Sequence, residues 1–362
     1  MTATDTTKAA SSTPAIIATR GSKLALWQAE FVARKLTEKA GLSSRLEVIR
    51  TTGDAVQDRF LHEIGGKGLF VRELEEALAA RRADIAVHSL KDMPVNLPSG
   101  FALAAVMKRH VAHDVIIFRR EIAQALGLGA APGDGRALDA AGVASLGPLQ
   151  VASSSLRRSC LIRQAAPKIR MVAVRGNVDT RLRKLAEGRF DAIILAGAAL
   201  ERLGPDIVPD FDQFATRKLD ESWFVPCAGQ GALAIETRSE VLQSPNTKNA
   251  ERAQLVHALE SLNCANTMRA VTIERNVLRA LGGDCTMPFG CHVTQQGQLL
   301  SASAVVLDQN GNAARSSWAG PVAGFPGETE VSSQLVRMLR DNGVDTVLDN
   351  LGLDGKPRSV TH

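Results

Sequence analysis

Short apolar segments alternate with amphipathic ones along most of this chain, and the alternation starts twice. In the first part, apolar segments at Ala15–Thr19, Leu46–Arg50 and Asp84–Val87 are separated by helical patterns at Leu24–Leu36 and about Leu69–Arg81. Period-2 or continuous apolar runs favour strands, whereas apolar residues three and four apart favour helices. A β-α-β-α-β order predicts a mostly parallel sheet with right-handed crossovers.

The pattern restarts after the Gly- and Ala-rich stretch Ala125–Gly147, which we interpret as a loose insertion or a weak helix. Three further apolar segments are each followed by a helical pattern. The pairs are Leu149–Ala152 with Leu156–Gln164, Met171–Val174 with Val178–Ala186, and Phe190–Ala196 with Ala198–Leu203. This part predicts a second α/β domain of similar plan.

The region from about Ala250 differs from both. It has a long helical pattern, Leu255–Leu281 with a break near Asn263, then strands around Val293 and Leu299–Leu307, and a last helix at Glu328–Asn342. This order predicts a smaller α+β domain, and 362 residues suffice for three domains at roughly 100–200 residues each. The expected limits are 15–112 plus 230–250 for domain 1, 113–229 for domain 2 and 251–362 for domain 3, with 226–231 as a crossing segment or hinge.

Polar residues gather where the expected strands end. In open α/β sheets, ligands bind outside the carboxyl ends of the strands. Ser22 and Ser155 also fall at the start of a helix, where free N–H groups and the helix dipole favour an anion. These strand-end residues predict a site for a polyanion between two domains; they are Arg20, Ser22, Thr51, Thr52, Asp54, Ser89, Lys91 and Asp92 in the first domain, and Ser153, Ser154, Ser155, Arg157, Arg158, Arg175 and Arg181 in the second.

The positive charge of the chain is concentrated on one side of this site. Ser153–Arg189 holds ten basic and two acidic residues, whereas the rest of the chain holds 33 basic and 36 acidic ones. The segment contains no Phe, Trp or Tyr on which bases could stack, which disfavours nucleic acid. Several Arg side chains suit carboxylates through paired hydrogen bonds. The residues therefore predict a polyanionic ligand, and a ligand with several carboxylates is one candidate.

The glycines of Gly65–Gly68 resemble a phosphate-binding loop only superficially. Gly68 follows Lys67 where a Ser or Thr would have to bind magnesium, and no strand leads directly into the loop. We expect residues 52–68 to form a mobile lid in which Lys67 is a further anion contact.

Each of these residues also has a simpler interpretation. An Arg at a helix start is more often a solvated charge, and a Ser there is more often only an N-cap. Asp92 could be an N-cap or the ion-pair partner of an Arg, and Cys285 a small hydrophobic residue. The same placement in both domains favours a site. Two function classes compete with an enzyme: a two-lobed protein that only binds anions, and a nucleic-acid-binding protein.

From Ile17 to about Gly290, the chain resembles the porphobilinogen deaminase family. The motifs that carry the resemblance occur in the family's order. They are Ala18-Thr19-Arg20-Gly21-Ser22, Gly65-Gly66-Lys67-Gly68-Leu69-Phe70, His88-Ser89-Leu90-Lys91-Asp92-Met93-Pro94, Ser154-Ser155-Leu156-Arg157-Arg158, Arg175-Gly176-Asn177-Val178 with Thr180-Arg181, Gly229-Gln230-Gly231, and Gly282-Gly283 followed by Cys285.

The resemblance implies a fold of two periplasmic-binding-protein-like βαβ domains that enclose a cleft, plus a smaller α+β C-terminal domain. It implies a dipyrromethane cofactor joined by a thioether to Cys285, although Asp284 stands where the family's commonest pattern has the cysteine directly after Gly-Gly. Asp92 matches the catalytic aspartate, which assists the loss of ammonia from porphobilinogen and stabilises the cation that results. Four condensations and a hydrolysis would then give hydroxymethylbilane.

The same resemblance assigns side chains to the acetate and propionate groups of cofactor and substrate. The full set of expected binding residues is Arg20, Ser22, Lys67, Ser89, Lys91, Ser154, Ser155, Arg157, Arg158, Arg175, Gly176, Asn177, Arg181, Arg202 and Gln230. No metal, nucleic acid or membrane partner is expected, and we expect a monomer.

The remaining features concern the compartment. The five cysteines lack the regular spacing of a metal site, which favours reduced thiols in a cytoplasmic protein. Residues 1–14 lack the apolar core of a signal peptide and are expected to be a frayed tail. No apolar run approaches the roughly 20 residues that a bilayer requires.

Overall fold

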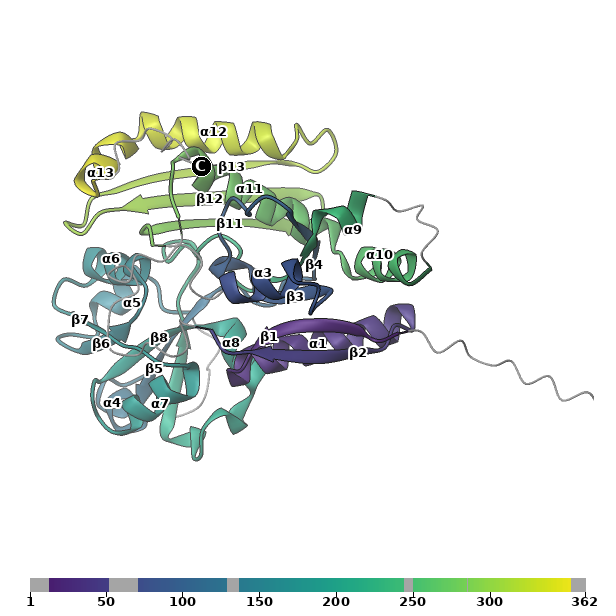
Figure 1. The fold of residues 1–362 in the computed structure, drawn as a ribbon. Coiled ribbons are helices and arrows are strands. Elements are labelled where there is room, and N and C mark those ends of the chain that lie inside the picture. The colour runs from purple at the N-terminus through teal and green to yellow at the C-terminus, as the bar shows by residue number, and fades with distance from the viewer. Residues whose placement is uncertain (1–12, 52–70, 129–136, 244–249, 285, 353–362) are drawn as a thin grey trace, which may run out of the picture.

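The computed structural model describes residues 13–51, 71–128, 137–243, 250–284 and 286–352 (Figure 1). Within them the chain forms two five-stranded sheets and one three-stranded sheet, each with helices packed against it. The prediction of two α/β domains and a smaller α+β domain is confirmed by these sheets. The expected lid at residues 52–68 lies outside the described residues.

The first sheet has the strand order β2-β1-β3-β10-β4. Apolar residues of β1, β3 and β10 pack on one face against the helices α1 and α10, and those of β1 and β3 pack on the other face against α3. Its elements are β1 Ala15–Arg20, α1 Lys23–Ala40, β2 Ser44–Ile49, α3 Arg72–Ala79, β3 Ile85–Ser89, the 3₁₀ turn η1 Leu90–Asp92, β4 Phe101–Val106, β10 Leu233–Arg238, α9 Ser239–Gln243 and α10 Ala250–Leu262.

The second sheet has the order β7-β6-β8-β5-β9. Its elements are β5 Asp114–Arg119, α4 Arg120–Ala125, α5 Ala140–Ala144, β6 Gln150–Ser153, α6 Leu156–Ala165, β7 Arg170–Ala173, α7 Val178–Ala186, β8 Ala192–Ala196, α8 Gly197–Leu203, the turns η2 Pro205–Ile207 and η3 Phe211–Gln213, and β9 Phe214–Lys218. Helix α7 begins and ends at the residues that the sequence pattern indicated.

The two large sheets share one plan. Three parallel strands are followed by one antiparallel strand, β10 or β5, and then by a fifth strand. Residues 107–113 lead from β4 to β5, and residues 219–232 lead from β9 back to β10, so the chain passes between the sheets twice. A Cβ at Gly231, where φ is +84°, would lie 2.5 Å from the carbonyl oxygen of Val111, so only glycine allows the two crossings to approach this closely.

The C-terminal part forms the antiparallel sheet β11-β12-β13. Its elements are α11 Ala265–Ala280, β11 Phe289–Gln296, β12 Leu299–Leu307, β13 Ala313–Pro321, α12 Glu328–Asp341 and α13 Val344–Asn350. Helices α11 and α12 pack on this sheet around a core that includes Ile273, Val293 and Leu335. In Figure 1 the sheet and α12 lie at the top, above the other two sheets.

The helical pattern at 255–281 is broken at the expected place. Helix α10 ends at Leu262 and α11 begins at Ala265. Between them, Asn263 Oδ1 accepts a hydrogen bond from the backbone N–H of Val106 (3.0 Å), and the N–H of Cys264 donates to the carbonyl oxygen of Val106 (2.8 Å). The break therefore fixes the chain to β4.

Helix α10 packs with a different domain from the one that sequence analysis predicts. Sequence analysis places residue 251 onward in the third domain, but Leu255 and Leu259 of α10 belong to the same core as Ile17 and Ile235 of the first sheet. This helix packs with the first domain because its apolar face meets α1. The other expected limits stay a prediction.

Candidate active site

The carboxyl end of the first sheet brings Arg20 and Ser89 to one edge, because β1 and β3 are parallel neighbours. Gln28 of α1 donates a hydrogen bond to the Ser89 hydroxyl (2.9 Å) and so fixes the end of β3. The chain then turns through η1, which carries Lys91 and Asp92. Lys91 is partly buried and Asp92 is exposed, and no hydrogen bond from any described residue reaches the Asp92 carboxylate. Burial lowers the pKa of Lys91, and the nearby Asp92 acts in the opposite direction.

Both serines expected at helix starts are N-caps. The Ser22 hydroxyl accepts a hydrogen bond from the N–H of Ala25 (3.3 Å) at the start of α1. The Ser155 hydroxyl does the same for the N–H of Arg158 (3.4 Å) at the start of α6. Both serines therefore cap a helix, as the simpler interpretation predicts. A role in anion binding would be additional to this capping role.

Ser154 and Arg181 meet at the carboxyl end of the second sheet. Nη1 of Arg181 donates to the exposed Ser154 hydroxyl (2.9 Å), and its Nε donates to the carbonyl oxygen of Gly176 (2.6 Å). Burial, together with repulsion from Arg158 and Arg175, lowers the pKa of Arg181 to about 10. Arg181 is therefore a guanidinium in a positive environment. It is not the freely solvated charge of the simpler interpretation.

The remaining expected residues of this edge lie on the loop before α7. The Lys184 ammonium donates to the carbonyl oxygen of Arg175 (3.0 Å), which holds the end of β7. Asn177 is the N-cap residue of α7, but its side chain makes no capping hydrogen bond. The loop therefore presents Arg175, Gly176 and Asn177 beside Arg181.

Asp92 interacts electrostatically with cations of both domains. Burial lowers the pKa of Lys91 in its own domain and of Arg181 and Arg202 in the second, and the charge of Asp92 acts in the opposite direction on all three. Arg202 is 5% exposed, and its Nη2 donates to the carbonyl oxygen of Gly231 (2.8 Å); burial lowers its pKa to about 10. None of these three cations forms an ion pair with a carboxylate of the described residues. The edges of the two sheets thus place the Asp92 carboxylate near three cations that form no ion pair with a described carboxylate, although the charge of Glu201 also acts on Arg202.

Behind this edge lies a buried ion cluster that sequence analysis did not anticipate. Asp114, fully buried at the start of β5, accepts hydrogen bonds from Nη2 of Arg157 (2.7 Å) and from Nε and Nη2 of Arg158 (3.0 and 2.7 Å). Burial alone would raise the pKa of Asp114, but the two guanidinium groups outweigh it and lower the pKa to about 2. The sequence feature that could have indicated this cluster is an acidic residue, Asp114, directly before the apolar run Val115–Phe118.

Gln230 connects the buried cluster to both crossing segments. It is 1% exposed, and its amide nitrogen donates to the carbonyl oxygen of Ala112 (2.5 Å) and to Asp114 (3.0 Å). Its amide oxygen accepts from Lys91 and Arg158 at 3.5 Å each, at the limit of hydrogen bonding. Sequence analysis predicts that Gln230 contacts a ligand. In the structure, the hydrogen bonds of its amide nitrogen connect the two domains to each other.

A second buried carboxylate ties the third domain to the crossings. Glu274 of α11, fully buried, accepts hydrogen bonds from both Nη atoms of Arg109 (2.8 and 2.7 Å). It also accepts from the backbone N–H groups of Gly229 (2.7 Å) and Val293 (2.8 Å). This one side chain therefore fixes α11 and β11 to both segments that pass between the large sheets. Nothing in the spacing of the sequence indicated it.

Four expected site residues, Thr52, Asp54, Lys67 and Cys285, lie outside the described residues, but both neighbours of Cys285 are described. Gly283 packs so closely against Met287 Sδ and Leu278 that a Cβ there would overlap both. Asp284 accepts hydrogen bonds from the N–H (2.9 Å) and the hydroxyl (2.5 Å) of Thr286. The loop after α11 is thus built around a glycine and an Asp-centred turn, and Asp284 has a structural role in it.

Within the described residues, no helix is long and apolar enough to cross a membrane.

Comparisons with known proteins agree with the resemblance in the motifs. The family model described as "Porphobilinogen deaminase, dipyromethane cofactor binding domain" matches residues 15–244, and "Porphobilinogen deaminase, C-terminal domain" matches residues 268–320. A curated porphobilinogen deaminase of Albidiferax ferrireducens is 42% identical over 299 residues, which cover 82% of this chain and 83% of the relative. That of Syntrophobacter fumaroxidans is 38% identical over 337 residues, which cover 92% and 97%.

Solved structures were matched with much lower similarity. The VFT2 domain of Bordetella pertussis BvgS is 16% identical, with a TM-score of 0.38 over 69% of this chain and 86% of that one. A TM-score this low adds nothing to the description of the fold given by the sheets themselves.

Proposed function

Because this chain belongs to the porphobilinogen deaminase family, we propose that it carries out the family's reaction with the strand-end residues described above. In that reaction, porphobilinogen units are joined head to tail onto a dipyrromethane cofactor, and each addition releases one ammonia. After four additions, water releases hydroxymethylbilane. The enzyme is accordingly a transferase, and we propose that it acts in the cytoplasm as a monomer.

The placement of Asp92 among cations of both domains is the observation that carries this proposal. Each pyrrole unit brings an acetate and a propionate group, so the growing chain adds negative charge at every step. Lys91, Arg181 and Arg202 supply positive charge that no described carboxylate pairs with. A partly desolvated guanidinium gains more from an anionic partner than a solvated one does.

The residues present fit the dipyrromethane cofactor. Nε of Arg157 and Nε of Arg202 are buried and have no hydrogen-bond partner among the described residues, which is costly unless a ligand provides one. These two unpartnered donors suit the ring carboxylates of a two-pyrrole group. When bound, the cofactor supplies the terminal pyrrole ring to which substrate is added. Cys285 would hold it through a thioether, because it follows a loop that Gly283 and Asp284 shape.

Asp92 acts on the substrate unit that loses ammonia. As the carbon–nitrogen bond breaks, positive charge develops on the ring and its methylene carbon, and a carboxylate held nearby lowers the energy of that charge. Asp92 is exposed and accepts no hydrogen bond from a described residue, so its oxygens are open to a pyrrole N–H. Lys91 beside it balances the charge when no substrate is bound.

Arg157 and Arg158 play a different part from the other arginines. Their donors are largely engaged by Asp114, the carbonyl oxygen of Val225 (2.7 Å) and the carbonyl oxygen of Ile194 (3.2 Å). We therefore assign them chiefly to holding the second domain's edge in place, with ligand contact through what remains of their donors. Arg20, Ser22, Ser89, Ser154, Ser155, Arg175, Gly176, Asn177 and Gln230 complete the proposed site within the described residues.

Intact-protein mass spectrometry tests the proposal. Freshly prepared, active enzyme should carry the mass of a two-pyrrole adduct, and brief exposure to porphobilinogen should add species heavier by whole substrate units less ammonia. Cys285→Ala should lack the adduct, whereas Cys264→Ala, a matched control on a described and partly exposed thiol, should keep it.

The competing functions predict other outcomes. An unmodified mass in active protein would contradict the covalent cofactor. Tight carboxylate binding without turnover would favour a two-lobed binding protein. Steeply salt-dependent binding of nucleic acid that porphobilinogen oligomers cannot displace would favour a nucleic-acid-binding protein.

A further inference from the structure

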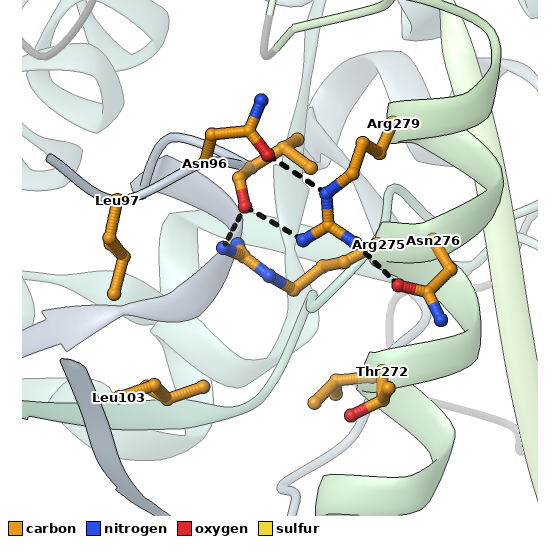
Figure 2. A pocket seen from close by; sticks show the side chains of 9 residues that line it. Asn96, Leu97, Leu103, Thr272, Arg275, Asn276 and Arg279 are labelled. Carbon is orange, nitrogen blue, oxygen red and sulfur yellow. Dashed lines mark hydrogen bonds between the residues drawn. The ribbon is translucent and has the colours of Figure 1, made fainter. Parts of the chain in front are cut away.

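A pocket of about 420 Å³ lies between β4 of the first sheet and α11, and none of the strand-end residues lines it. It is bounded by the segment after η1, by β4 and by one face of α11. Figure 2 shows Arg275 and Arg279 reaching from α11 toward Asn96. The residues that line it are Val95, Asn96, Leu97, Leu103, Val271, Thr272, Arg275, Asn276 and Arg279.

The two arginines of this pocket have only neutral partners. Arg275 is 9% exposed, and its Nη2 donates to the carbonyl oxygens of Pro94 (2.7 Å) and Val95 (3.0 Å). Arg279 donates to the amide oxygens of Asn96 (2.8 Å) and Asn276 (2.5 Å) and to the same Val95 oxygen (3.1 Å).

Among the described residues, no carboxylate forms an ion pair with either guanidinium. Because Arg275 and Arg279 are four residues apart, they lie on one face of α11 and their charges repel. Burial and this repulsion lower the pKa of Arg275 to about 10, while the more distant Glu236 acts in the opposite direction. The pocket therefore holds two positive charges without an anion in contact with them.

Beside the arginines, the lining combines three polar side chains, those of Asn96, Thr272 and Asn276, with an apolar part. Val95, Leu97, Leu103 and Val271 line it, and Figure 2 shows Leu97 and Leu103 across the pocket from Thr272. An inorganic anion would leave these side chains without a contact, whereas an organic one would cover them. A volume of this size is within the range of small-molecule sites.

We propose that this pocket binds a small organic dicarboxylate, whose carboxylates pair with Arg275 and Arg279 and whose carbon chain covers the leucines. The site is distinct from the one that holds cofactor and substrate, since it shares no residue with it. Its occupant would join the segment that follows Asp92 to the helix that precedes the Cys285 loop. The ligand would thus strengthen the contact between the first and third domains.

Calorimetric titration of the holoenzyme with glutarate tests the site. Glutarate should bind the unaltered enzyme, and Arg279→Gln should weaken its binding at least tenfold, since the exposed Arg279 can be replaced without opening the core. Arg337→Gln, an exposed arginine on α12, is the matched control and should bind as tightly as the unaltered enzyme. Equal affinity in the Arg279→Gln enzyme, or no binding to any of them, would overturn the proposal.

Two further measurements separate this site from its alternatives. Glutarate binding that survives in Arg279→Gln and disappears in Arg181→Gln would place the ligand at the strand-end residues and contradict the pocket. Inorganic phosphate that binds as tightly as glutarate would contradict an organic ligand. In support, glutarate should raise the melting temperature of the unaltered enzyme and not that of Arg279→Gln, because ligand binding stabilises the folded state by mass action.

Discussion

Two pairs of arginines lie within one region of this molecule and differ in their partners. Arg157 and Arg158 are buried against Asp114, which accepts from both. Arg181 and Arg202 interact with Asp92 only at longer range and form no ion pair with a described carboxylate. All four are helical arginines that pack with the second sheet, so the partner decides what each pair does.

This difference in partners indicates which pair stabilises the fold and which pair is available to bind a ligand. A buried guanidinium that already shares a carboxylate is fixed in place and rigidifies the edge of its sheet. A desolvated guanidinium without an anion is ready to receive one from a ligand. Substitutions in the first pair should therefore change stability, and those in the second should change binding.

The largest effect is expected from Asp114→Ala. Removing this carboxylate leaves two buried arginines without their anion, and breaking a buried pair in this way costs roughly 3–5 kcal/mol. Urea unfolding followed by circular dichroism should show this loss. Asp212→Ala, at an exposed acid of the same domain, is the control and should change the free energy of unfolding by less than about 1 kcal/mol. A small loss for Asp114→Ala would mean that the buried cluster does not support the fold.

Asp92→Asn, in contrast to Asp114→Ala, should leave the stability of the fold unchanged and should lower turnover. Because Asp92 is exposed and accepts no hydrogen bond from a described residue, the unfolding free energy should stay within about 0.5 kcal/mol of the original. Turnover should fall by about 10²–10³-fold, which is typical when one group that stabilises transition-state charge is removed. Steady-state assays with porphobilinogen measure this. Near-normal turnover would remove Asp92 from the catalytic role.

Arg181→Met should weaken binding without loss of stability. Its guanidinium is held in a positive environment, which lowers its pKa to about 10, so losing the charge relieves repulsion in the free enzyme. We expect KM for porphobilinogen to rise about tenfold, equivalent to about 1.4 kcal/mol, with an unchanged or higher melting temperature. Arg163→Met, on the exposed face of α6, should change neither. A lower melting temperature for Arg181→Met would place Arg181 with the supporting pair.

The last effect concerns acid stability. The pKa of Asp114 is lowered from 3.8 to about 2 in the folded protein, so its ionised form stabilises the fold above pH 4. This contribution, on the order of 2 kcal/mol, should disappear as the pH falls from about 4 to 2. Arg158→Gln removes one cause of the shift and should show a shallower loss over that range. An identical pH dependence of unfolding in both proteins would contradict the assignment.

The order of strands and helices follows from local pattern. Alternating apolar runs and helical periodicity indicated β1, β3, β6 and β8 and the helices between them. The strand-end rule also predicts that Asp92 and Arg181 belong to one site. Such inferences are possible because hydrophobic periodicity and parallel pairing act within each βαβ unit.

Other features depend on residues far apart along the chain. Neither the antiparallel direction of β5 and β10 nor the packing of α10 on the first domain was indicated by their own segments. The sequence by itself determined the fold class, the concentration of positive charge and the acid that faces it. Only the tertiary structure decided which arginines are neutralised, because Asp114 meets Arg157 and Arg158 across a sheet whose strand order local pattern does not specify.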